Sequence, residues 1–284
     1  MKFTTLEVDI NHRVALVWLA RESVRNAFNE TSIAELTQAF KELGDNNDVR
    51  AIVLAAKGPA FCAGADLAWM KRMAEYSDAE NRADALRLAT MLRTIYECPK
   101  PVIARVQGDA YAGGVGLVAA CDIAVASLNA TFCLSETRLG LIPATIGPYV
   151  LRAMHPHIAR RYFLTAEKFT AAEAFRIGLA HEIAPAEELD GKINEILGAL
   201  MLTSQSAVVE AKRLVRDLTA RPIDDRLIED TAQRIAAIRG SADGREGVRS
   251  FLDKRKPRWV VDYEAAVAAN SESMSEPVGG SEPE

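Results

Sequence analysis

The 284-residue sequence has few cysteines, few histidines and no long apolar run. Its four cysteines, Cys62, Cys98, Cys121 and Cys133, form no Cys-x-x-Cys pair and lie in or beside apolar stretches, so we expect buried, reduced thiols. No stretch approaches the ~20 apolar residues of a membrane-spanning helix, and the first ten residues lack the apolar core of a signal peptide. These absences favour a cytoplasmic protein.

An excess of positive charge is also absent. The net charge is −5, and residues 269–284 contain four glutamates without a lysine or an arginine, so the rest of the chain is nearly neutral. A nearly neutral body offers no general attraction for nucleic acid. The end of the chain, residues 263–284, is acidic and rich in small and polar residues, and we expect it to be disordered.

Signatures of several other chemistries are missing. The histidines are isolated or flank Pro156, so no metal site is predicted, and no G-x-S-x-G nucleophile motif occurs. Residues 114–119 fit the dinucleotide-binding pattern G-x-G-x-x-G/A. That pattern begins seven residues after a predicted strand ends at Gln107, and the helix after it has room for only about two turns. Dinucleotide binding is therefore disfavoured.

Alternating strand and helix patterns are present over the first two thirds of the chain. Runs of β-branched and aliphatic residues predict strands at 14–19, 49–55, 101–107, 122–126 and 131–133. Helical spacing and capping residues predict helices at 29–43, capped by Asn29 and stopped by Gly44, and at 77–97. A capping box at Thr170–Glu173 predicts a short helix ended by Gly178, and further helices are expected at 204–218 and 224–238. The order predicts a mainly parallel α/β core followed by a helical region.

Residues 110–122, Ala-Tyr-Ala-Gly-Gly-Val-Gly-Leu-Val-Ala-Ala-Cys-Asp, place three glycines at the start of a predicted helix. Inside a helix, Gly113, Gly114 and Gly116 would each cost about 1 kcal/mol relative to alanine, so we expect a compensating role. Small residues let a ligand approach the N-terminal N–H groups of a helix, which lack partners and carry the positive end of its dipole. The spacing alone is equally compatible with glycines that only permit close helix packing.

Two further loops, residues 61–66 and 134–143, combine small residues with a position after a predicted strand. Two such loops could direct two N–H groups at one oxygen, an oxyanion hole in which one donor typically contributes about 3 kcal/mol of transition-state stabilisation. The carboxylate best placed for proton transfer is Glu136, between a short predicted strand and Gly140. A lone glutamate in a loop is more often simply solvated.

Five segments occur in the order Arg25-Asn-Ala-Phe28, Phe61-Cys-Ala-Gly-Ala-Asp-Leu67, Gln107-Gly108 through Gly113-Gly114 to Ala120-Cys-Asp122, Glu136-Thr-Arg-Leu-Gly-Leu-Ile-Pro143 and Glu246-Gly-Val-Arg-Ser-Phe-Leu252. Together, and in this order, they resemble the enoyl-CoA hydratase/isomerase (crotonase) family over residues ~5–260. The resemblance implies an α/β fold, a crotonase-like spiral of ββα units with a C-terminal helical trimerisation region. The implied divisions are a spiral core at 1–195, a helical oligomerisation region at 196–262 and the acidic tail at 263–284.

The resemblance also implies a site and its ligand. The substrate is an acyl-CoA thioester, coenzyme A is part of that substrate, and no separate cofactor or metal is expected. The thioester oxygen would receive the N–H groups of Ala63 and Gly113, and Glu136 would be the acid/base. The substrate-binding residues implied by the family are Val24, Arg25, Ala27, Ala65, Asp66, Leu67, Gly114, Gly116, Phe251 and Lys254. The basic segment 245–258 would help to hold the CoA phosphates, and the protein would form trimers or hexamers.

The sequence departs from the family's hydratase pattern at Gly116, where that pattern places a second catalytic glutamate. We expect Gly116 to line a pocket and leave room for a substrate with its own distal carboxylate. Trp18-Leu19, Ala63–Met70, Gly116-Leu117 and Phe132–Glu136 are most similar to bacterial 3-methylglutaconyl-CoA hydratases of leucine breakdown. The leading hypothesis is therefore hydration of an α,β-unsaturated acyl-CoA. The alternatives are a double-bond isomerase with one glutamate and a non-catalytic acyl-CoA-binding homologue.

Overall fold

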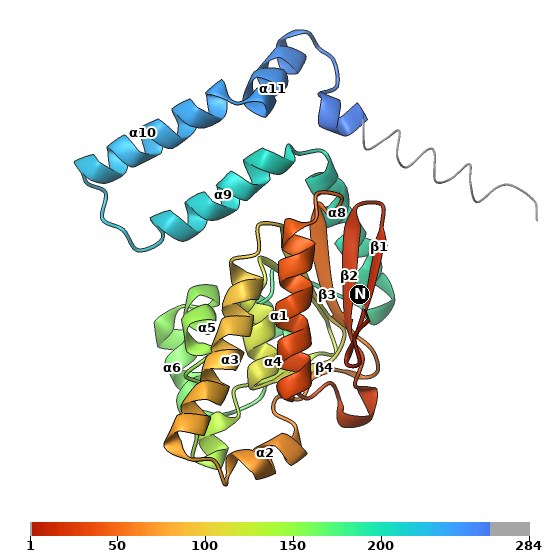
Figure 1. The fold of residues 1–284 in the computed structure, drawn as a ribbon, viewed down its shortest axis with the longest axis vertical. Coiled ribbons are helices and arrows are strands. Elements are labelled where there is room, and N and C mark those ends of the chain that lie inside the picture. The colour runs from red at the N-terminus through yellow and green to blue at the C-terminus, as the bar shows by residue number, and fades with distance from the viewer. Residues whose placement is uncertain (1, 262–284) are drawn as a thin grey trace, which may run out of the picture. The chain divides into compact units, whose positions relative to one another are not determined.

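A computed structural model describes residues 2–261 of the protein (Figure 1). The chain divides into two compact units, residues 1–197 and residues 198–284. The strands are β1 (Leu6–Asn11), β2 (Val14–Leu19), β3 (Ala51–Ala56), β4 (Ala60–Cys62), β5 (Val102–Val106), β6 (Asp109–Tyr111), β7 (Ile123–Ser127), β8 (Thr131–Cys133), β9 (Phe169–Thr170) and β10 (Glu182–Ala184). The α-helices of the first unit are α1 (Glu30–Asp45), α2 (Leu67–Met73), α3 (Asp78–Tyr96), α4 (Gly113–Ala120), α5 (Gly147–Ala153), α6 (Pro156–Thr165), α7 (Ala171–Arg176) and most of α8 (Leu189–Met201).

The second unit is helical in its described part. It contains α9 (Gln205–Leu218), α10 (Asp225–Gly240) and α11 (Ala242–Leu252). Three short 3-10 turns lie in the first unit: η1 (Glu22–Val24), η2 (Glu136–Leu139) and η3 (Ala186–Glu188). The predicted helices at 204–218 and 224–238 are confirmed within one or two residues at each end.

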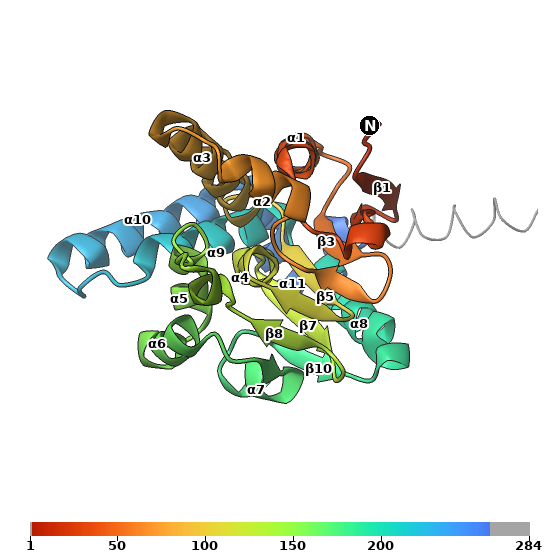
Figure 2. The same ribbon diagram turned by 90° about the horizontal axis from the view of Figure 1, so that it is seen from below.

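The strands form two mixed sheets. The large sheet has the order β1-β2-β3-β5-β7-β10, with β1 antiparallel to β2 and the other pairs parallel. The small sheet has the order β4-β6-β8-β9, with β9 antiparallel to β8. Figure 2 shows β3, β5, β7 and β10 following one another across the large sheet. The predicted mainly parallel core is confirmed.

Successive strand pairs connect the two sheets. The pairs β3–β4, β5–β6 and β7–β8 each place their first strand in the large sheet and their second strand in the small one. A helix follows the first two pairs, and η2 with α5 follows the third, so each unit moves one position along both sheets. This arrangement confirms the expected series of ββα units.

The core forms where the sequence pattern places it. All six residues of β3 are buried, as expected for a central parallel strand covered on both faces. On α1, Ile33, Leu36, Phe40 and Leu43 are at most 2% exposed, which confirms their predicted face. Asn29 and Ser32 form a reciprocal capping box at the start of α1. The predicted stop at Gly44 is confirmed within one residue.

Gly44 lies in the last turn of α1 and packs against Pro99. A Cβ on Gly44 would lie 3.1 Å from Cδ of Pro99, so a larger residue would be tightly packed there. The helix ends one residue later, at Asp45.

The predicted capping box at Thr170 is only half formed. The Thr170 hydroxyl accepts a hydrogen bond from Glu173 N–H, but the Glu173 carboxylate binds Tyr162 and Arg176 instead of returning to the cap. Gly178, with φ of 88°, follows α7 as expected.

The four cysteines are free thiols, three buried and Cys121 half-buried. Among residues 2–261, no helix is long and apolar enough to cross a membrane. The proposed division into a core and an oligomerisation region stays a prediction, and the predicted disordered tail, residues 263–284, lies outside the described residues.

Candidate active site

Three loops meet at one edge of the small sheet. They follow the carboxyl ends of β4, β6 and β8, which are neighbouring parallel strands. The loop after β6 contacts both neighbours: Ala112 N–H donates to the Cys133 carbonyl at 2.8 Å, and a Cβ on Gly64 would lie 3.2 Å from Cβ of Ala112. The carboxyl edge of an α/β sheet is the usual place for a ligand.

The N–H group of Ala65, rather than that of Ala63, is free to bind a ligand. Ala63 N–H donates to the carbonyl oxygen of Arg25 at 3.0 Å, so the predicted role of Ala63 as oxyanion donor is wrong. Phe28 N–H donates to the carbonyl oxygen of Gly64 at 2.7 Å. In a trans peptide the N–H points away from the C=O, so Ala65 N–H points away from Phe28. No residue in the described part of the chain accepts a hydrogen bond from it.

The N–H group of Gly113 is directed in the same way. The Ala112 carbonyl accepts hydrogen bonds from Val115 N–H at 2.9 Å and Gly116 N–H at 3.3 Å, so it points along α4. Gly113 N–H, on the same peptide, therefore points out beyond the N-terminus of the helix, and no residue from 2 to 261 accepts from it. Ala112 adopts φ of 47° and ψ of −116°, a strained conformation that typically costs about 1–3 kcal/mol.

The first two glycines of α4 bring this helix against the other loops. A Cβ on Gly113 would lie 2.6 Å from Cε2 of Phe28, and one on Gly114 would lie 2.5 Å from the carbonyl oxygen of Cys62. Close packing and access to the helix N-terminus are therefore both required at Gly113. Gly114 is buried, and its packing against Cys62 is the role that the structure shows.

Gly116 does not line an open pocket. It is buried in α4, and a Cβ there would lie 2.2 Å from Cγ2 and 2.8 Å from Cβ of Ile146. The prediction that Gly116 leaves room for the acyl chain is wrong, because Ile146 at the start of α5 fills that space. The third glycine allows α4 to pack against α5.

Glu136 has a carboxylate oxygen without a hydrogen-bond partner in the described chain. It begins η2, three residues after β8, and its Oε2 atom is buried without a hydrogen-bond partner among the described residues. Burial raises the pKa of Glu136. A partly desolvated carboxylate with a raised pKa is a stronger base than an exposed one, and it can accept a proton and return it.

The Asp66 carboxylate, in contrast, is fully used by the protein. Oδ1 accepts from Ala68 N–H at 2.8 Å and Trp69 N–H at 3.2 Å, which caps α2, and Oδ2 accepts from Arg21 at 2.8 Å. Burial alone would raise the pKa of Asp66, but these hydrogen bonds outweigh it and hold the pKa below its usual value. The predicted substrate-binding role of this side chain is therefore corrected to a structural one.

The segment around η1 supports the loop after β4. Arg25 and Asn26 both have positive φ, and the Arg25 guanidinium binds Asp109 Oδ2 at 2.8 Å. The Arg25 side chain is still 55% exposed, Val24 is 39% exposed and Ala27 is buried. Binding of substrate by these residues, and by Leu67 with 76% exposure, stays a prediction.

Phe251 and Lys254 belong to the second unit. Phe251 is 82% exposed on α11, and Lys254 follows α11 with φ of 54°. Within the basic segment, Arg255 forms a bidentate pair with Glu246 at 2.7 and 2.9 Å. The segment therefore carries less free positive charge than its composition suggests, and CoA binding by Phe251 and Lys254 stays a prediction.

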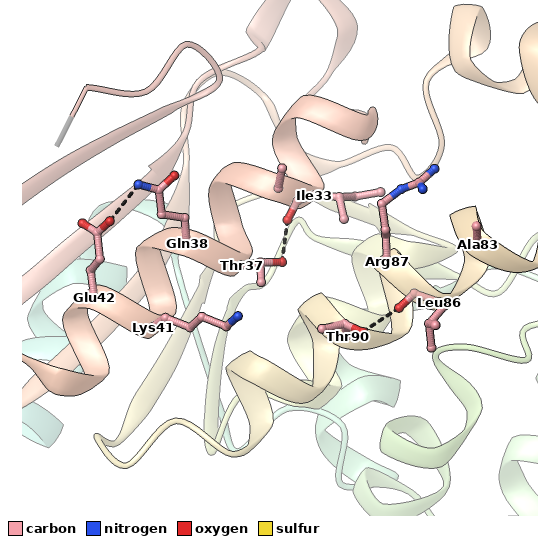
Figure 3. Close-up of a pocket in the computed structure, with 10 residues that line it drawn as sticks. Ile33, Thr37, Gln38, Lys41, Glu42, Ala83, Leu86, Arg87 and Thr90 are labelled. Atoms are coloured by element: carbon pink, nitrogen blue, oxygen red, sulfur yellow. Dashed lines mark hydrogen bonds between the residues drawn. The ribbon is translucent and has the colours of Figure 1, made fainter. Parts of the chain in front are cut away.

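Two sizeable grooves contain none of the residues of this edge. One, of about 680 Å³, lies between α1 and α3 and contains none of the predicted site residues (Figure 3). Figure 3 shows Thr37 and Lys41 on α1 and Leu86 and Thr90 on α3, so the lining side chains come from both helices. The other, of about 860 Å³, lies between α9 and α10. No cluster of three metal-ligating side chains occurs within residues 2–261.

Sequence reasoning missed Arg21, Asn26 and the donor role of Ala65. Asn26 is 4% exposed, and its amide donates to the carbonyl oxygens of Lys57 and Ala60 at 2.8 and 2.9 Å. No local pattern marks such long-range contacts. The choice between Ala63 and Ala65 depends on which peptide faces Phe28, and only the bridge between Phe28 and Ala65 reveals it.

Comparison with known proteins agrees with this geometry. A family model described as enoyl-CoA hydratase/isomerase matches residues 9–261. The chain is 30% identical over 262 residues to a crotonyl-CoA hydratase of Syntrophomonas wolfei, covering 92% of this chain and 99% of that protein. A solved enoyl-CoA hydratase from Shewanella pealeana is 40% identical with a TM-score of 0.89, covering 91% and 97% of the two chains. One from Mycobacterium smegmatis is 34% identical with a TM-score of 0.85, covering 90% and 99%. The chain therefore belongs to the enoyl-CoA hydratase/isomerase family and has its α/β crotonase fold.

Proposed function

We propose that the protein adds water to an α,β-unsaturated acyl-CoA, with Glu136 as acid/base and the N–H groups of Ala65 and Gly113 as donors to the thioester oxygen. One observation carries this proposal. The Glu136 Oε2 atom is buried without a partner in the described chain, and its loop follows β8 at the same sheet edge as the two loops whose N–H groups are free. Buried polar atoms without partners are rare, and a ligand commonly supplies the missing one.

The reaction requires one carboxyl group in two steps. The Glu136 carboxylate accepts a proton from water as the oxygen bonds to C3, and the C2=C3 electrons move onto the thioester oxygen. The resulting enolate receives hydrogen bonds from Ala65 and Gly113, donors directed at the atom where charge develops. The Glu136 carboxyl then returns its proton to C2, which completes the addition of water and regenerates the carboxylate.

A second candidate is double-bond isomerisation at the same site. Gly116 favours it, because this residue provides no second carboxylate. The close contact with Ile146 also leaves no space for a longer side chain at that position. Moving a proton between C2 and C4 requires only one base and the same enolate. Glu136, Ala65 and Gly113 would then have unchanged roles without activating water.

The proposed substrate class is an enoyl-CoA with a distal carboxylate, and 3-methylglutaconyl-CoA of leucine breakdown is the best candidate. Support comes from the similarity of Ala63–Met70 and Phe132–Glu136 to hydratases of that substrate. Trp69 lies in the first turn of α2, four residues after Ala65, and its buried indole N–H has no acceptor among the described residues. A carboxylate on the acyl chain could accept from such a donor.

A panel of substrates tests these proposals. The absorbance of the conjugated enoyl thioester is followed with 3-methylglutaconyl-CoA, crotonyl-CoA and a 3-enoyl-CoA. Loss of absorbance with the first two supports hydration, and faster loss with 3-methylglutaconyl-CoA supports the distal carboxylate. Appearance of absorbance from the 3-enoyl-CoA supports isomerisation. Binding of all three without turnover would contradict both catalytic proposals.

We also propose that the second unit mediates trimers or pairs of trimers. Val215, Ile228 and Ile235 are 70%, 58% and 47% exposed, and the last two line the groove between α9 and α10. Apolar residues exposed along such a groove are typical of interaction surfaces. Sedimentation of the full chain at micromolar concentration is expected to give a trimer or hexamer, and a monomer would contradict this proposal.

A further inference from the structure

We propose that Arg21 is a positioning residue that holds the Ala65 N–H in its catalytic direction. It acts through residues 21–28, which we call the strap. The inference rests on the proposed role of Ala65 as a donor to the thioester oxygen. Nothing in the reaction itself requires Arg21 to touch the substrate.

The strap fixes three peptide groups of the loop after β4. Ala63 N–H donates to the Arg25 carbonyl at 3.0 Å, and Asp66 N–H donates to the Phe28 carbonyl at 2.8 Å. Between them, the Gly64 carbonyl accepts from Phe28 N–H at 2.7 Å. With these three groups held by the strap, the Ala65 N–H is the peptide donor left on the opposite side. Its direction is therefore set by the strap.

Arg21 ties the strap to the loop and to α2 through one side chain. Its guanidinium donates to Oδ2 of Asp66 at 2.8 Å and also to the carbonyl oxygen of Ala27. The Arg21 and Asp66 side chains are only 20% and 10% exposed, so solvent screens this pair weakly. The same Asp66 carboxylate caps α2 with its other oxygen. Arg21 thus links the strap, at Ala27, to the C-terminal end of the Ala65 segment, at Asp66.

The strap itself has an independent anchor. Asn26 donates to the carbonyl oxygens of Lys57 and Ala60, and its own amide oxygen accepts from Arg21 N–H at 2.9 Å. Removing the Arg21 side chain leaves this anchor and the α2 cap in place. The three backbone hydrogen bonds between the strap and the loop also remain, so the expected change is a small displacement of the Ala65 N–H rather than loss of the strap.

The test separates positioning from general stability. Arg21→Met and Asp66→Asn are compared with Arg72→Met. Arg72 is 51% exposed on α2 and pairs with Glu30 at 2.7 Å, so its loss removes an ion pair without touching the strap. Three quantities are measured: kcat, the Kd of butyryl-CoA, and the pH at which bound acetoacetyl-CoA shows its enolate absorbance. The saturated butyryl group needs no enolate stabilisation, whereas the acetoacetyl enolate carries charge on the atoms that the donors would bind.

For Arg21→Met we expect kcat to fall at least about tenfold, since misplacing one preorganised donor has effects of this order. Enolate absorbance should appear at higher pH, and the Kd of butyryl-CoA should change less than about threefold. Arg72→Met should leave all three at wild-type values. If Arg21→Met does not fold, Asp66→Asn, which keeps the cap acceptor, carries the same expectation.

Wild-type kcat and enolate formation in the Arg21→Met or Asp66→Asn protein would overturn the inference. So would a parallel loss of kcat and butyryl-CoA affinity. A wild-type protein that binds acetoacetyl-CoA without promoting its enolate would instead overturn the proposed function. The two failures are thus distinguishable.

Discussion

The two sheets of the first unit differ in what they contribute. The large sheet has strands of three to six residues, and β3 at its centre is entirely buried. The small sheet has strands of only two or three residues, yet Ala65, Gly113 and Glu136 all follow its strands. The large sheet contributes to the proposed site only through the strap, which follows β2.

This difference separates stability from chemistry. Long buried strands contribute most of the apolar area that stabilises the fold. Very short parallel strands place three loops side by side with little side-chain volume between them, so peptide N–H groups and one carboxyl can approach a common ligand. Substitutions in the two sheets should accordingly affect different measurements.

Leu54→Ala in β3 is expected to have the largest effect. Leu54 is fully buried, and truncating such a leucine typically lowers the free energy of unfolding by about 2–5 kcal/mol. Urea unfolding measures this loss. The kcat of the fraction that remains folded should stay near the wild-type value. A selective loss of kcat would contradict the proposal that the large sheet provides stability and the small sheet provides the chemistry.

Gly113→Ala should mainly affect catalysis. The new Cβ would lie 2.6 Å from the Phe28 ring, so either the ring or the start of α4 must move. A displaced donor of this kind is expected to lower kcat by about 10²-fold, with a smaller change in the affinity for butyryl-CoA. Steady-state kinetics and equilibrium binding measure the two effects. Equal losses in both would show that Gly113 has only a packing role.

Gly116→Ala, three residues further along α4, provides the contrast. Its Cβ would meet Ile146 at 2.2 Å, an overpacking that typically costs about 1–3 kcal/mol of stability. We expect a lower urea midpoint with near-normal kcat. A stable protein with altered substrate preference would restore the pocket-lining role that the structure contradicts.

Lys254→Ala combined with Lys256→Ala is expected to have the smallest effect. If the basic segment holds the CoA phosphates, the Kd for CoA should rise a few-fold at low salt and its dependence on salt should weaken, since screened charge pairs contribute about 1 kcal/mol or less each. Titrations of CoA at two salt concentrations measure this. An unchanged salt dependence would leave these lysines as solvated surface charges.

Features that depend on local sequence were predictable, and features that depend on long-range contacts were not. The Asn29 cap, the buried face of α1 and the three loops after β4, β6 and β8 follow from periodicity and small-residue clusters. The position of Glu136 after a predicted strand made it the best-placed carboxylate, and the resemblance to the family supplied its acid/base role and the ββα arrangement. The error at Gly116 arose because Ile146 lies thirty residues away in sequence. No local sequence pattern indicates that Ile146 fills the space beside Gly116.

The error at Ala63 has a related cause. Ala63 and Ala65 are identical residues in one short loop, and the peptide that faces the strap decides which N–H is free. The tie between Arg21 and Asp66 spans forty-five positions and was likewise not visible in the sequence. Tertiary contacts, rather than residue type, assign roles within this loop.

The most direct test of the account is the pH dependence of turnover in the wild-type protein and in Glu136→Gln. Burial raises the pKa of Glu136, so wild-type turnover should fall as pH decreases through that raised value and the carboxylate becomes protonated. Glu136→Gln should bind butyryl-CoA normally, turn over at least about 10²-fold more slowly at neutral pH and lose this acid limb. Near-normal turnover of Glu136→Gln, with the acid limb retained, would contradict the central claim that Glu136 moves the proton.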